Sequence, residues 1–141
     1  MATNLTDLTV SGTVSAATAS VTTLNATTAV ISGSVATGQI QMAAATAYAT
    51  NGAVSPADIW ATLTKGSAGA YTLAAPGASN VGKIITITAG SAFAHVLTVT
   101  GLVGGNTLTF TNAIGHSVQL LAVSATVWGI ISIAGAAQSN V

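Results

Sequence analysis

Short runs of alternating apolar and polar residues, each closed by a turn containing glycine, follow one another through the second half of the chain. In the run 83–89, Ile85 and Ile87 share one face, and Thr86 and Thr88 share the other. This period of two is typical of a strand with one buried face. Short strands at such regular spacing predict a small β-sandwich or jelly-roll-like domain, and an Ig-like topology fits the pattern equally well. The expected strands are residues 59–64, 70–74, 83–89, 96–100, 107–111, 118–124 and 127–133.

The core of this domain is expected to form from the larger apolar side chains of these runs, because aromatic residues make up only 4% of the chain. The expected core residues are Ile59, Leu63, Tyr71, Leu73, Ile85, Ile87, Leu97, Val99, Leu108, Phe110, Leu120 and Ile131. Trp60 and Trp128 fit either the core or a contact surface, since a buried indole needs a hydrogen-bond acceptor that the sequence does not reveal.

A weak repeat occupies the N-terminal part of the chain. Its two copies read LTVSGTVSA at residues 8–16 and AVISGSVAT at residues 29–37. Each copy has only a few modest apolar side chains, so such units must stack on neighbours or on other chains to bury them. The repeat therefore predicts an extended strand-turn segment intertwined in a trimer. The residues expected to make inter-chain contacts are Leu5, Leu8, Val10, Val14, Val21, Leu24, Val30, Ile31 and Val35.

Three regions follow from these patterns. Residues 1–38 are expected to form the β-repeat that serves for trimerisation, residues 39–56 a linker, and residues 57–141 the β-domain. Within the linker, the Ala-rich run 42–49 fits a short helix or an extended segment. Asn51-Gly52 is a turn signal, and Pro56 holds the residue before it extended.

Charged residues make up 3% of the chain, against roughly 25% in ordinary domains. They are Asp7, Asp58, Lys65 and Lys83, and the net charge is zero with neutral histidines. Such a surface suits dense packing against other protein, because little charge is desolvated on contact. Two lysines neutralise too few phosphates for a nucleic-acid partner.

The residues for catalysis are scarce. Asp7 and Asp58 are the only side-chain carboxylates and lie in different regions, and no nucleophile elbow of the form Gly-x-Ser-x-Gly occurs. His95 and His116 have no metal-ligand spacing, and the chain has no cysteine. The sequence therefore predicts a protein that is not an enzyme and has no metal or other cofactor. The alternative is a metal site formed by three copies of one histidine on the axis of a trimer.

An uncharged stretch at residues 118–137 has about the length of a bilayer span. It contains several polar and β-branched residues, and Ser124-Ala125-Thr126 divides it into two strand-sized pieces. A buried hairpin is expected in preference to a membrane helix, and no membrane partner is predicted.

The units LTVSGTV and AVISGSV resemble the strand-turn repeats of trimeric phage fibres and fibre-attached decoration proteins. The segment LTKGSAGAYTLAAPGASNVGKIITITAG, with HVLTVTG, LTFTNAIGHSV and VWGI after it, resembles small β-domains of phage virion proteins. Those include bacteriophage capsid decoration (cement) proteins and head fibres. The resemblance implies a homotrimer on the outer capsid surface of the virion, bridging subunits of the major capsid protein, with no catalytic residues. It gives residues 1–38 capsid attachment as an alternative to trimerisation.

The sequence therefore leaves two alternative functions open. The first is a structural cement protein that stabilises the head by bridging capsomers. The alternative is a head or tail fibre component whose β-domain binds a host-surface glycan through exposed aromatic rings. The candidate aromatic residues are Tyr48, Trp60, Tyr71 and Trp128, with Phe93 a weaker one.

Overall fold

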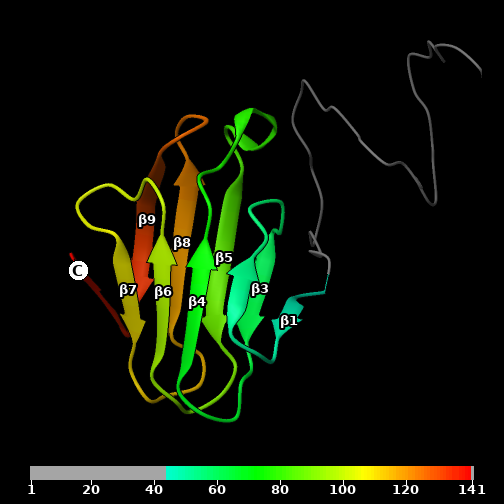
Figure 1. Ribbon diagram of the computed structural model, residues 1–141, viewed down its shortest axis with the longest axis vertical. Coiled ribbons are helices and arrows are strands. Elements are labelled where there is room, and N and C mark those ends of the chain that lie inside the picture. The colour runs from blue at the N-terminus through cyan, green and yellow to red at the C-terminus, as the bar shows by residue number, and fades with distance from the viewer. Residues whose placement is uncertain (1–43, 141) are drawn as a thin grey trace, which may run out of the picture. The chain divides into compact units, whose positions relative to one another are not determined.

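The computed structural model describes residues 44–140, and these form two five-stranded mixed β-sheets (Figure 1). The all-β class expected from the sequence is confirmed for this part of the chain. The N-terminal repeat and all nine expected inter-chain contact residues, from Leu5 to Val35, lie outside the described residues.

The first sheet, called sheet A, has the strand order β1-β3-β5-β8-β9. Strands β1, β3 and β5 run parallel, and β8 and β9 continue the sheet antiparallel. Their bounds are β1 Thr46–Tyr48, β3 Trp60–Leu63, β5 Ile84–Ala89, β8 Ser117–Ala122 and β9 Trp128–Ala134.

The second sheet, called sheet B, has the order β10-β7-β6-β4-β2. Strands β2, β4 and β6 are parallel, and β7 and β10 are antiparallel to their neighbours. Their bounds are β2 Gly52–Val54, β4 Gly69–Leu73, β6 His95–Val99, β7 Thr107–Phe110 and β10 Ala136–Ser139. Between β4 and β5, residues Ala78–Asn80 form a single 3₁₀ turn, η1.

Every connection from β1 to β6 crosses from one sheet to the other. Successive strands of the same sheet are therefore parallel neighbours, a pairing that the sequence-based expectation of a sandwich or jelly roll did not include. The outer strands of both sheets come from the two ends of the described chain, with β1 and β2 at one edge and β9 and β10 at the other. Figure 1 shows β1 on one side of the view, with β7 and the C-terminus on the opposite side.

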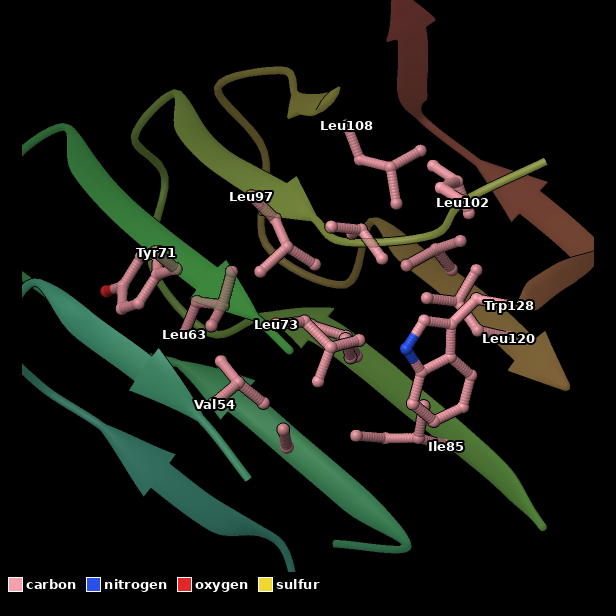
Figure 2. Close-up of a cluster of buried hydrophobic side chains, with 14 of the residues drawn as sticks. Val54, Leu63, Tyr71, Leu73, Ile85, Leu97, Leu102, Leu108, Leu120 and Trp128 are labelled. Carbon is pink, nitrogen blue, oxygen red and sulfur yellow. The ribbon is translucent and has the colours of Figure 1, made fainter. Parts of the chain in front are cut away.

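The core lies between the two sheets, and Figure 2 shows side chains from both of them meeting there. The strict alternation of burial in β4, β5, β6 and β8 explains why the sequence pattern located these strands. Ten of the twelve expected core residues are buried, and these are Leu63, Tyr71, Leu73, Ile85, Ile87, Leu97, Val99, Leu108, Phe110 and Leu120.

The prediction is wrong for the other two residues, Ile59 and Ile131, which are 52% and 49% exposed. Ile59 precedes the first residue of β3 and is not enclosed between the sheets. Ile131 is the extra residue of an irregularity between β8 and β9, where Leu120 pairs with Ile130 but Gln119 pairs with Ser132. A bulge of this kind leaves one residue unpaired and breaks the alternation of faces.

All the strands expected from the sequence are present within one or two residues of their expected ends. The stretch 118–137 contains β8, β9 and the start of β10, as the hairpin expectation requires, and not a helix. Within residues 44–140 no helix has the length and apolar character needed to cross a membrane.

The region 39–56, expected as a linker, differs from that expectation where the structure describes it. It contributes β1 and β2 as outer strands of the two sheets, and residues 46–48 are a strand where a short helix was one alternative. These strands have three residues each, which is too short to display a period of two. The backbone ladders to β3 and β4, which the sequence does not encode locally, hold them in place.

Candidate functional site

Trp60 lies at the start of β3 on the outer face of sheet A and is 40% exposed. Its backbone is paired with Thr86 of β5, but its indole Nε1 donates a hydrogen bond of 3.2 Å to Thr88 Oγ1, further along the same strand. The ring therefore lies across β5 and does not stand off the sheet. The indole is thus held to the sheet by its Nε1 while much of the residue stays open to solvent.

A row of polar side chains continues from Trp60 across the sheet. Gln119 on β8 donates from Nε2 to Thr86 Oγ1 over 3.3 Å, and Ser132 on β9 donates from Oγ to Gln119 Oε1 over 3.4 Å. The strand register places Trp60, Thr86, Gln119 and Ser132 side by side on successive strands. We call these four residues and Thr88 the Trp60 row. Because Thr86 and Thr88 act as acceptors in these bonds, their own hydroxyl hydrogens can donate outward.

Beside this row, the same face of sheet A carries an apolar strip. Ile84 pairs with Leu121, and Leu121 pairs with Gly129. Ile84 is 46% exposed and Val123 is 55% exposed. The Val123 side chain lies close to Gly129, where an added Cβ would come within 2.9 Å of it. An uncharged face with an aromatic ring, a polar row and an apolar strip can bind a neutral partner.

The strands of both sheets contain no Asp, Glu, Lys or Arg. The charged residues in the described part of the chain lie in connections and have polar partners. Lys65 donates to Asn51 Oδ1 and to the Ala68 carbonyl, and Lys83 donates to Asn80 Oδ1. Asp58 accepts a 2.6 Å hydrogen bond from the Tyr48 hydroxyl. The outer faces of both sheets are therefore uncharged.

The other aromatic candidates occupy different environments. Tyr71 and Trp128 are in the core, at 1% and 0% exposure, so their rings offer no surface to a ligand. Trp128 Nε1 donates to the Ala74 carbonyl over 2.9 Å, which supplies the acceptor that a buried indole needs. Tyr48 is half-buried, while Phe93, in the loop between β5 and β6, is 40% exposed.

Tyr48, the last residue of β1, fixes the connection between β2 and β3. Its hydroxyl donates to Asp58 and accepts from the Ser55 backbone N–H over 2.8 Å. Burial, followed by the hydrogen bond to Asp58, raises the pKa of Tyr48 above its usual value. Tyr71 in turn donates to the Tyr48 carbonyl, which joins the two aromatic residues across the sheets.

The two histidines are held separately. His95 is fully buried at the start of β6, with Nε2 2.9 Å from Ser91 Oγ and its ring edge-on to Tyr71. His116 lies 2.6 Å from Thr111 Oγ1 through Nδ1. His95 and Ser91 are therefore in contact, but His95 Nδ1 has no hydrogen-bond partner in the described residues, so no carboxylate completes a catalytic triad with them. In the residues that the structure describes, no group of three His, Cys, Asp or Glu side chains could hold a metal ion.

The sequence singled out Trp60 but not the polar row beside it. Thr86, Gln119 and Ser132 come from strands far apart in the chain, and they meet only because β5, β8 and β9 are neighbours. Alternation alone could assign each residue to an outward face, but the strand order and the register that align them come from the fold.

No family model, no curated protein and no solved structure matches this chain.

Proposed function

We propose that the chain is a structural virion protein, a homotrimeric bacteriophage capsid decoration protein that binds the outer capsid surface and stabilises the head by bridging capsomers. The observation that carries the proposal is the absence of charged residues from all the described strands. A protein with uncharged sheet faces can pack closely against neighbours without desolvating ions.

The edge strands support the same proposal. β1, β2, β9 and β10 contain neither charged residues nor proline, which soluble proteins commonly use to block pairing at sheet edges. β9 carries Ile131 and Ile133 at 49% and 37% exposure. Edges of this kind are suited to a crowded protein lattice, where neighbouring subunits cover them.

In this role the protein acts mechanically. A trimer attached at several points holds adjacent subunits of the major capsid protein together, so contacts that are weak singly act at high effective concentration. The N-terminal repeat would supply the contacts between sister chains, as its thin apolar stripe requires. Neither a cofactor nor a catalytic residue enters this mechanism, and the proposed protein is not an enzyme.

Sedimentation of the purified full-length chain tests the proposed trimer. Wild type should sediment as a trimer, and Val10→Asp or Ile31→Asp should give monomers, because each places a charge in the expected inter-chain stripe. Thr9→Asp is the matched control, since residue 9 alternates with residue 10 and is expected on the polar face. A wild-type monomer at high concentration, or a trimer that survives both substitutions, contradicts the assembly.

Attachment to the capsid is tested separately. Purified protein added to heads that lack it should raise the temperature at which they release DNA, and electron microscopy should locate it on the outer surface. If the protein leaves that temperature unchanged, or if imaging locates it on the tail alone, the cement function is wrong.

A further inference from the structure

We propose that the Trp60 row on the outer face of sheet A is a binding platform for a neutral polysaccharide. This proposal does not depend on capsid attachment, because it concerns a surface of the β-domain and a different class of ligand. Its basis is the placement of one exposed indole beside a row of hydroxyl and amide groups on a face without charge.

The indole provides the stacking surface. A sugar ring has a face of C–H groups that packs on a flat aromatic ring, and this contact needs an indole that lies along the protein surface with one side open. Trp60 meets that requirement, because the bond from Nε1 to Thr88 Oγ1 holds the ring across β5 while the residue stays 40% exposed. The same bond fixes the ring before a ligand arrives, which reduces the entropy lost on binding.

The polar groups beside the indole match the edge of a sugar. Hydroxyl groups of a saccharide both donate and accept hydrogen bonds, and so do threonine and serine hydroxyls and glutamine amides. The bonds from Gln119 to Thr86 and from Ser132 to Gln119 hold these side chains in a line next to the ring. Neighbouring strands lie about 4.8 Å apart. A line across four strands therefore offers polar groups along a length suited to several sugar units.

Charge selects the class of polysaccharide. The face has no Lys or Arg to pair with uronic, sialic or phosphate groups, and Lys83, which precedes β5, is bound to Asn80. An anionic glycan would lose hydration here without gaining an ion pair. A neutral hexose polymer has no such penalty.

The apolar strip of Ile84, Leu121 and Val123 also suits contact with protein, and a second copy of this chain is the competing occupant. The polar row favours the saccharide, because a sugar carries hydroxyl groups along its edge that can meet the hydroxyl and amide groups of the row. The experiment separates these two occupants.

The test is frontal affinity chromatography of the full-length protein on columns that carry mixed-linkage β-glucan, galactomannan or dextran, with alginate as the anionic comparison. At least one neutral column should retard wild type, while alginate should not. Trp60→Ala should reduce affinity at least tenfold, Gln119→Ala should reduce it severalfold, and Trp60→Phe should retain part of it. Thr98→Val, which changes an exposed threonine of sheet B, is the matched control and should bind as wild type does.

Fluorescence gives a second readout, because the two tryptophans differ in exposure. Trp128 is fully buried, so acrylamide quenches mainly Trp60. The polysaccharide that retards the protein should lower the quenching constant in wild type and leave it unchanged in Trp60→Phe, which retains only Trp128.

Three results would overturn the platform. They are no retardation of wild type on any neutral column, equal retardation of wild type and Trp60→Ala, and a smaller sedimenting species for Trp60→Ala than for wild type. The last result would assign this face to contact between copies of the chain.

Discussion

His95 Nε2 and Ser91 Oγ lie 2.9 Å apart, and this contact fixes the protonation of a fully buried ring. Ser91 donates its own hydrogen to the Lys65 carbonyl over 2.6 Å, so its oxygen accepts from His95. Nε2 therefore carries the proton, and Nδ1 is a buried acceptor without a hydrogen-bond partner in the described residues. The neutral ring joins the β3–β4 loop to the start of β6.

Acid should weaken this junction. Burial, with a smaller contribution from the Lys65 charge, lowers the pKa of His95 below 6.5. The folded state thus favours the neutral ring, and its stabilising contribution is complete above pH 6.5 and is lost progressively as the pH falls toward the lower folded value. Urea unfolding between pH 7.5 and 4.5 should show this loss.

His95→Gln should flatten that pH dependence, since glutamine can still donate to Ser91 but does not titrate. His116→Gln is the matched control and should retain the wild-type slope. A slope as steep in His95→Gln as in wild type would assign the effect to other groups.

Gly101 is expected to resist substitution more strongly than Gly77. Both have positive φ, at 80° and 74°, so alanine strains the backbone at each. An added Cβ at position 101 would collide with the Thr126 carbonyl, whereas position 77 has open space. Gly77→Ala should cost about 1 kcal/mol and Gly101→Ala about 2 kcal/mol more, measured by urea unfolding. Equal losses would mean that the loop from Gly101 moves away from Thr126 without strain.

Trp128→Phe should destabilise the protein by about 1–3 kcal/mol, because it leaves the Ala74 carbonyl without its donor and opens space in the core. Trp60→Phe should change stability by no more than about 0.5 kcal/mol, since that ring lies on the surface. Thermal unfolding of the two variants checks this contrast. Similar losses in both would show that Trp60 has a structural role.

Tyr48→Phe should loosen the connection between β2 and β3. The change removes the donor to Asp58 and the acceptor for the Ser55 N–H, with an expected loss of about 1–2 kcal/mol. Hydrogen exchange at the Ser55 amide should accelerate. Exchange at the Thr100 amide, which donates to the Leu73 carbonyl, should change only by the loss of global stability. An unchanged rate at Ser55 would contradict this role of Tyr48.

Alternation located the strands of the β-domain because their inward residues are buried and apolar, while many of their outward residues are threonine. It was wrong for Ile131, because a bulge depends on how two strands align and not on the local pattern. It also missed the parallel pairing of β1, β3 and β5, because that pairing joins residues through crossovers of varying length. Trp60 could be singled out from composition, but its polar neighbours required the strand order.

The alternation of the chain between the two sheets has a mechanical consequence. Because β1 and β2 lie at one edge and β9 and β10 at the other, a pull between Thr46 and Ser139 loads both layers together, and every strand pair lies in the path of the force. Stripping β1 from its sheet brings the tension directly to β2 in the opposite sheet. Strands must therefore detach alternately from the two sheets, so neither sheet can be removed while the other stays intact.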